Sequence, residues 1–218
     1  MSQIRPLFAV PFGFAQYPQS EPLNARLREL FIAREAEGAR YANPMPYTER
    51  NASVFESRFD LFAWPQPEII QLRDFCMSHL SQVIGQLSGF DERELGNLGV
   101  KTDAWFHITR RNGYFGVHNH PLASWSGVYC VAPGISDANE PDSGKLTFIT
   151  PHHASGMYVD AGSEHLKPPF GIQNFGLCLE AGQLVLFPSF LLHQVLPFYG
   201  EGERITVAFN CAFQRRKG

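Results

Sequence analysis

Two histidines, His118 and His120, flank a single asparagine in the stretch GVHNHPLASWSGVYCV, residues 116–131. The run that follows them has the pattern of a β-strand. Side chains alternate between the two faces of an extended chain, so both imidazoles leave the same face. Such a pair is either a solvated pair near a turn or part of a metal site. The choice depends on whether the chain supplies a third ligand.

A third histidine, His193, stands in apolar surroundings within GQLVLFPSFLLHQV, residues 182–195. Taken alone, a histidine of this kind is more often a hydrogen-bonded core residue than a ligand. Together with His118 and His120 it would complete a set of three ring nitrogens. Neutral imidazole suits iron among other transition metals. The three residues are therefore candidate metal ligands.

The strand pattern ERITVAFN, residues 203–210, places Arg204, Thr206 and Asn210 on one face. An arginine in this apolar setting needs an anionic partner, either a protein carboxylate at the strand end or a bound anion. If the strands beside the turn YGEG pair as a hairpin, Arg204 lies about 10–13 Å along the backbone from the point facing His193. Because the arginine can lean back, the remaining gap suits a small dicarboxylate such as 2-oxoglutarate, held between a metal and the guanidinium.

The order of these motifs resembles the signature of the Fe(II)/2-oxoglutarate-dependent oxygenases, which is His-x-carboxylate, a distal His and then Arg-x-Ser/Thr. More narrowly, HNHPLASWSGVY, GQLVLFPSFLLHQV and ERITVAFN are similar to a group of bacterial and phage members. The resemblance covers residues 105–213 and is weaker over the N-terminal part. It implies a mainly β fold with N-terminal helices, whose core is a double-stranded β-helix of the jelly-roll and cupin type.

His120 departs from the family pattern, because most members carry Asp or Glu there and bind iron through two histidines and one carboxylate. The resemblance makes His118 and His193 the two histidine ligands. His120 is either the third ligand of a three-histidine Fe(II) site, or it lies beside the metal and leaves a coordination position open, as in the related halogenases. With three histidines, only the co-substrate would neutralise the charge of the metal.

The resemblance also assigns roles on the co-substrate side. Arg204 matches the residue that binds the distal carboxylate of 2-oxoglutarate, preferably through both guanidinium nitrogens, and Thr206 could add a hydrogen bond. Weaker candidates for cofactor binding are Asn210 and Tyr129. Trp105 and His107 share one face of the first strand after residue 100 and could line the substrate pocket.

The implied reaction uses Fe(II), 2-oxoglutarate and O2 and releases succinate and CO2. Its default outcome is hydroxylation of an unactivated C–H bond in a small-molecule or amino-acid-like substrate. Two alternatives stay open. One is a cupin-type three-histidine dioxygenase without 2-oxoglutarate, which the pairing of Arg204 with Thr206 disfavours. The other is a non-catalytic jelly-roll protein that has kept a metal site.

Composition limits the other function classes. The 218 residues, 44% of them hydrophobic and 18% charged, suit one domain over residues 1–218. The net charge of −3 and the lack of a basic stripe argue against a nucleic-acid partner. The sequence contains no apolar run long enough for a signal peptide or a membrane span. The four cysteines lack CxxC spacing and are expected to be reduced core residues of a cytoplasmic protein. The oligomeric state stays open.

The elements that must position the candidate residues divide near residue 100. Residues 1–100 are expected to form a helical and irregular support with one possible short strand. Ser20 should cap a first helix that buries Leu23, Leu27, Leu30 and Phe31. A second helix should follow Pro67 and bury Ile69, Leu72, Cys76, Leu80, Val83 and Leu87.

Residues 101–218 should form the double-stranded β-helix. Strands are expected near 103–109, 114–118, 125–132, 144–149, 176–180, 183–188, 194–198 and 203–213. The long loop 151–175 has no periodicity, and its Gly and Pro content fits a lid over the pocket. Its histidines, His152, His153 and His165, are expected to be solvated.

Overall fold

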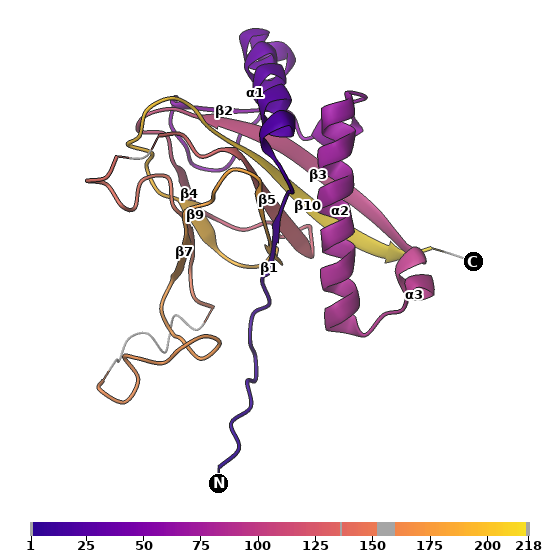
Figure 1. The fold of residues 1–218 in the computed structure, drawn as a ribbon, viewed down its shortest axis with the longest axis vertical. Helices are drawn as coiled ribbons and strands as arrows, with labels where there is room; N and C mark the ends of the chain where they lie inside the picture. Colours follow the sequence, from indigo (N-terminus) through magenta and orange to yellow (C-terminus); the bar gives the residue numbers. More distant parts are fainter. Residues whose placement is uncertain (1, 136, 152–159, 217–218) are drawn as a thin grey trace.

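A computed structural model describes residues 2–135, 137–151 and 160–216. Two antiparallel β-sheets form the core, and the helices lie outside the larger sheet (Figure 1). Side chains from both sheets line one pocket, so the sheets face each other as the two layers of a sandwich. This confirms the predicted mainly β, jelly-roll core with N-terminal helices.

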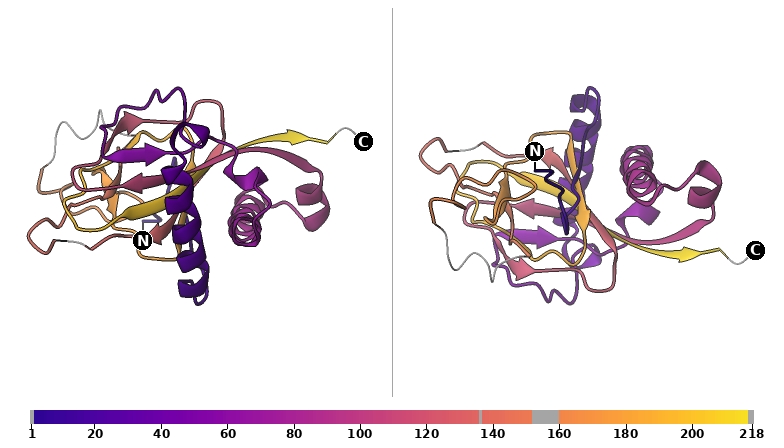
Figure 2. Two further views of the ribbon diagram at one scale, coloured as in Figure 1. Left: turned by 90° about the horizontal axis from the view of Figure 1, so that it is seen from above. Right: turned by 90° about the horizontal axis from the view of Figure 1, so that it is seen from below.

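The larger sheet has the strand order β1-β8-β5-β10-β3-β2. Its strands are β1 (Gly13–Gln16), β8 (Gln183–Pro188), β5 (Trp125–Ala132), β10 (Arg204–Arg215), β3 (Leu98–Thr109) and β2 (Val54–Glu56). β10 pairs with β3 along its whole length, from Arg204 opposite Thr109 to Arg215 opposite Leu98. Figure 2 shows this long pair of strands continuing past α2 toward α3 and the C-terminus. The bounds of β5 and β8 are those predicted, whereas β1 was not expected.

The smaller sheet has the order β4-β9-β6-β7. Its strands are β4 (Phe115–His118), β9 (His193–Val195), β6 (Leu146–Phe148) and β7 (Phe175–Leu177). Aromatic side chains join it to the larger sheet, as where the ring of Phe148 meets that of Phe187 edge to face with centroids 4.7 Å apart. This contact closes the sandwich beside His193, whose ring lies 5.1 Å from that of Phe187.

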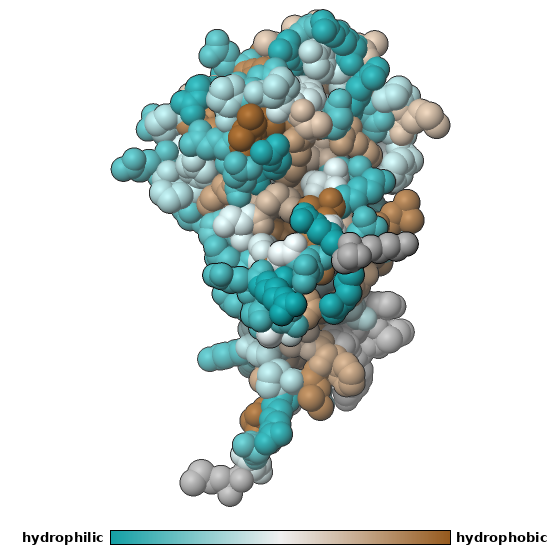
Figure 3. All heavy atoms as spheres, turned by 90° about the vertical axis from the view of Figure 1, so that its right-hand side faces the viewer, coloured by the Kyte–Doolittle hydropathy of each residue, from teal (hydrophilic) through white to brown (hydrophobic). Residues whose placement is uncertain are grey.

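Two long helices cover the outer face of the larger sheet. They are α1 (Glu21–Ala36), which contacts β5 and β3, and α2 (Pro67–Ser88), which contacts β1. The short helices are α3 (Glu92–Gly96), η1 (Gly38–Arg40) and η2 (Leu61–Ala63). α2 begins at a proline and ends at Gly89, whose φ of 68° lies in the left-handed region that favours glycine. The side that carries α2 is mostly hydrophilic, with scattered apolar residues (Figure 3).

Two details of the predicted helices are wrong. Ser20 precedes α1, but its side chain makes no capping hydrogen bond, because its backbone is already helical rather than extended. In α2 the buried stripe runs from Leu80 to Ile84, and Leu87 is 55% exposed. The buried residues follow one another at intervals of four from Leu72 to Ile84. The prediction instead placed Leu87 on the buried face, three residues after Ile84, where the side chain points to solvent.

Three of the four cysteines lie in the core as predicted, namely Cys76, Cys130 and Cys211. Cys178 is exposed, because it follows β7 at the edge of the smaller sheet. All four thiols are free. In the described part of the chain, no helix combines the length and the apolar character needed to cross a membrane.

Candidate active site

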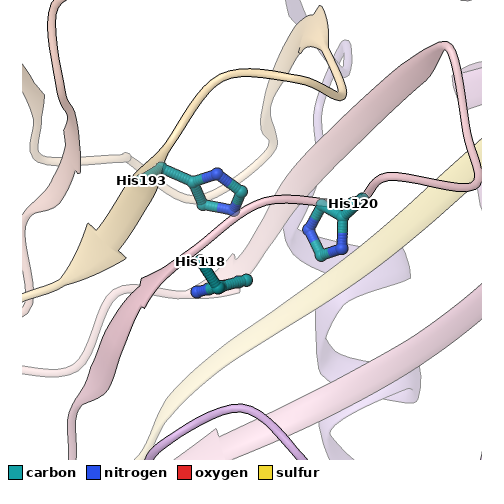
Figure 4. A group of neighbouring side chains, drawn as sticks. All are labelled: His118, His120 and His193. Carbon is teal, nitrogen blue, oxygen red and sulfur yellow. The ribbon is translucent and has the colours of Figure 1, made fainter.

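Three histidines converge at one end of the smaller sheet (Figure 4). His118 ends β4 and His193 begins β9, and the two residues lie directly opposite each other in the pairing of these strands. His120 follows β4 in the chain, and its backbone N–H donates to the carbonyl of Ser189 at 3.0 Å. One ligand atom of each histidine lies within 4.8 Å of those of the other two. The spacing therefore suits a single metal ion bound by all three rings.

Backbone carbonyls orient two of these rings. Nδ1 of His118 lies 2.8 Å from the carbonyl oxygen of Gly116, and Nδ1 of His193 lies 2.9 Å from that of Leu191. A carbonyl oxygen can only accept, so each Nδ1 carries the proton and each Nε2 keeps its lone pair. Metal-binding histidines are typically held in this way by a hydrogen bond from the other ring nitrogen.

Burial also favours the neutral form of the three histidines, which is the form that binds a metal cation. It lowers the pKa of His118, lowers that of His120 to about 4 and lowers that of His193 to about 3. Repulsion between the neighbouring rings adds to the effect on His120 and His193. All three rings are therefore neutral near pH 7, which is the form that binds a metal. The donor set fits Fe(II).

The same shifts predict how the metal-free protein responds to acid. Since the pKa of His120 and of His193 is lower in the folded chain than the ordinary value of about 6.5, the unfolded chain takes up protons first. Stability is thus complete above about pH 6.5 and falls as the pH drops toward 4 and 3. Thermal unfolding midpoints over this range should fall less steeply in His193→Gln than in the wild type. His165→Gln, which alters an exposed ring, should keep the wild-type slope; equal slopes in all three proteins would contradict this expectation.

Arg204 lies in the same pocket as the histidines but comes from the opposite sheet. It shares the pocket lining with Thr206 and Asn210, as the alternation along β10 predicts. The side chain is buried, and no carboxylate in the described residues pairs with its guanidinium. A buried cation without a partner is costly. The pocket therefore presents a site for an anion within the same cavity as the histidine cluster.

The route by which Arg204 reaches the histidines differs from the prediction. β9 pairs with β4 and β6, whereas β10 pairs with β3 and β5, so no hairpin forms across residues 199–202. The chain between His193 and Arg204 instead crosses from one sheet to the other. Arg204 consequently faces the histidines from the opposite sheet of the sandwich, and not from a strand paired with β9.

Asn210 is held by two buried serines. The hydroxyl of Ser126 lies 2.7 Å from Oδ1 of Asn210 and 2.8 Å from the hydroxyl of Ser189. An amide oxygen can only accept, so Ser126 donates to Asn210 and Ser189 donates to Ser126. Ser189 also accepts from the backbone of His120. The asparagine at the pocket wall is thus linked to the segment that carries the third histidine, a connection that the sequence did not indicate.

Trp105 and His107, the candidate substrate-pocket residues, both line the pocket that holds the three histidines. Nε2 of His107 lies 2.8 Å from the indole nitrogen of Trp105 and 3.1 Å from Oε2 of Glu56. This Nε2 accepts from the indole when it carries no proton and donates to the carboxylate when it does. Glu56 is a pocket residue that the sequence did not reveal, because its strand β2 lies in a segment without clear periodicity. Its local sequence, SVFESRF, also contains the charged residue Arg58 and gives no sign that Glu56 is buried.

Tyr129 is not in the pocket, so its predicted role in cofactor binding is wrong. It lies opposite Val207 on the face of the larger sheet that the helices cover. Its hydroxyl donates to Oδ1 of Asn24 in α1 at 2.8 Å. Strand alternation explains the error, because residues on the helix side and on the pocket side differ by a single step along the strand.

The loop predicted to cover the pocket also lies elsewhere in its described part. Residues 160–174 do not line the histidine pocket, and they border a separate apolar cavity together with residues 8–14. His165 is exposed, as expected. His152 and His153 fall outside the described residues. The predicted lid therefore has no support from residues 160–174.

Comparison with known protein families gives one match. Residues 103–210 match a family model described as "Putative 2OG-Fe(II) oxygenase". This range contains Arg204 and the three candidate metal ligands, His118, His120 and His193. No curated protein matches the sequence.

Solved structures share the fold at low sequence identity. A prolyl-4-hydroxylase from Pseudomonas putida is 20% identical, with a TM-score of 0.57 over 94% of each chain. A Trichoplax adhaerens prolyl hydroxylase in complex with a hypoxia inducible factor peptide is 13% identical, with a TM-score of 0.55 over 92% of this chain and 83% of that one. HygX from Streptomyces hygroscopicus, solved with nickel, 2-oxoglutarate and hygromycin B, is 11% identical, with a TM-score of 0.54 over 94% and 83%. The match of residues 103–210 to the family model places the chain in the family of 2OG-Fe(II) oxygenases.

Proposed function

We propose that His118, His120 and His193 hold the Fe(II) that this family uses, and that Arg204 binds the distal carboxylate of 2-oxoglutarate. The observation that carries the proposal is the buried guanidinium of Arg204, which has no carboxylate partner among the described residues and shares a pocket with three neutral imidazoles. When bound, the iron, 2-oxoglutarate and O2 supply the oxidising power and yield succinate and CO2.

The residues of the chain bind and orient the reactants. The guanidinium of Arg204 can donate two parallel hydrogen bonds to one carboxylate. Thr206 is buried two residues along the same face of β10 and offers its hydroxyl to the same anion. Asn210 stands farther along that face, where its NH2 group has no partner among the described residues and can donate to a bound molecule.

We propose that the reaction hydroxylates an unactivated C–H bond of a small-molecule or amino-acid-like substrate. The pocket wall combines aromatic side chains such as Phe59 and Trp105 with a few polar groups, which is typical of small-ligand sites. HygX binds the small molecule hygromycin B, and the Trichoplax enzyme binds a peptide. The buried Arg204, without a carboxylate partner in the part of the chain that the structure describes, favours this function over a three-histidine dioxygenase that needs no 2-oxoglutarate.

Two further proposals concern the whole chain. Residues of α1, α2 and the larger sheet share one hydrophobic cluster, which supports a single domain over residues 1–218. The four free thiols support a cytoplasmic location, where cysteines stay reduced.

The direct test is the conversion of 2-oxoglutarate. In air with Fe(II), the purified protein should release succinate slowly even without its prime substrate, because the co-substrate site is already formed. Metal-free protein and His118→Ala serve as controls and should release none. If the wild type, tested with a panel of small-molecule substrates, releases no more succinate than the metal-free protein, the proposed function is wrong.

A further inference from the structure

The three-histidine cluster has a charge deficit. Three neutral imidazoles contribute no negative charge, whereas a site with two histidines and a carboxylate contributes one. Among the described residues that line the pocket, one is a carboxylate, Glu56 of β2. It is not part of the cluster whose ligand atoms lie within 4.8 Å of one another. Its charge can therefore act on the site without a bond to the metal.

Glu56 is built into the structure as a buried anion. The residue is 6% exposed, and its carboxylate accepts from Asn43 at 2.6 Å and from Arg50 at 2.7 Å. Burial alone raises the pKa of Glu56, but the contacts with His107 and Asn43 and the charge of Arg50 outweigh it and hold the pKa at about 2. The group is thus ionised under all ordinary conditions.

The carboxylate of Glu56 shares a pocket with the three candidate metal ligands. In the pairing of β2 with β3, Glu56 lies directly opposite His107, which faces the pocket. Glu56 is buried in the wall of the pocket that the three histidines line, and charges interact more strongly there than in water. A negative charge in this wall favours a metal cation between the rings.

We propose that Glu56 supplies, from outside the coordination sphere, the negative charge that the three-histidine ligand set lacks, and that Arg50 partly cancels it. The inference rests on the proposed metal site at His118, His120 and His193. The role inferred for Glu56 is electrostatic, because its carboxylate is not among the grouped ligand atoms.

The charge role predicts opposite effects for the two members of the Arg50–Glu56 pair. Glu56→Gln keeps the size of the side chain but leaves the Arg50 cation unopposed, so the dissociation constant for Co(II) should rise about 10- to 100-fold, as for other residues that surround metal ligands. Arg50→Gln leaves the carboxylate unopposed, so Co(II) should bind several-fold more tightly. A purely structural role for the ion pair predicts that both changes weaken binding.

The experiment is a titration of the metal-free protein with Co(II), followed by its visible absorption and by calorimetry, without 2-oxoglutarate. The variants are Glu56→Gln, Arg50→Gln and the double variant, in which the charges cancel and binding should return toward the wild type. Glu49→Gln is the matched control, because Glu49 is an exposed carboxylate nearby that accepts from Tyr114. It should bind Co(II) like the wild type. Thermal unfolding identifies which variants are folded.

Several results would overturn the inference. These are wild-type affinity in folded Glu56→Gln, weaker binding in Arg50→Gln, or a loss in Glu49→Gln as large as that in Glu56→Gln. If Glu56→Gln does not fold, the direction of change in Arg50→Gln decides. Failure of the metal site itself gives a different pattern, in which the wild type does not bind Co(II) or His193→Ala binds it equally well.

Discussion

His120→Ala should lose its iron to the same extent as His118→Ala and His193→Ala. Each ring presents one nitrogen to a common point, with the ligand atoms within 4.8 Å of one another. Binding energies of about 10–16 kcal/mol for comparable zinc sites with four ligands correspond to about 3 kcal/mol per ligand. The loss of one ligand should thus weaken metal binding by about two orders of magnitude or more. Turnover should largely disappear in all three variants.

His120→Asp should be the best tolerated change at this position, because it restores two histidines and one carboxylate. The shorter side chain should leave the variant partly impaired. Iron content and the visible charge-transfer band with 2-oxoglutarate, measured without O2, are the readouts. His165→Ala, which removes an exposed ring, should keep full iron.

An unchanged His120→Ala variant would also give a clear answer. Full iron occupancy and wild-type turnover in His120→Ala would end the three-histidine hypothesis. The two remaining histidines would then hold the metal with an open coordination position. Chloride that binds there should perturb the charge-transfer band.

Arg204→Leu should raise the concentration of 2-oxoglutarate needed for succinate release by about 30-fold or more, since a buried charge pair of this kind is worth about 2–5 kcal/mol. Co(II) should still bind, and no more weakly than to the wild type, because Arg204 is not one of the candidate metal ligands and its loss removes a positive charge from the pocket. The variant should also be at least as stable as the wild type without 2-oxoglutarate, because leucine replaces a buried cation that has no carboxylate partner among the described residues.

Two control variants make this result specific. Arg204→Lys keeps the charge but not the two-pronged geometry, so it should fall between the wild type and Arg204→Leu. Arg110→Leu removes a surface arginine that pairs with Glu35 and should leave the 2-oxoglutarate requirement unchanged. An unchanged requirement in Arg204→Leu would mean that another basic residue holds the carboxylate.

Much of the site was determined by the sequence, because it depends on short-range order. Alternation along a strand has a period of two, so Arg204, Thr206 and Asn210 had to share a face once the strand was recognised. The spacing of His118 and His120 worked in the same way. The bounds of β5 and β8 followed from apolar runs between glycine and proline, and the resemblance of the motifs supplied the jelly-roll core.

The tertiary structure alone decided which faces and strands meet. Whether Tyr129 points to the pocket or to the helices depends on which face of the sheet α1 and α2 cover. Arg204 reaches the histidines because β9 and β10 enter different sheets, where a hairpin was predicted. Glu56 becomes a buried anion only through the pairing of β2 with β3, which sets it opposite His107. Long-range pairing leaves no local periodic signal, since each strand has the same alternation whichever partner it takes.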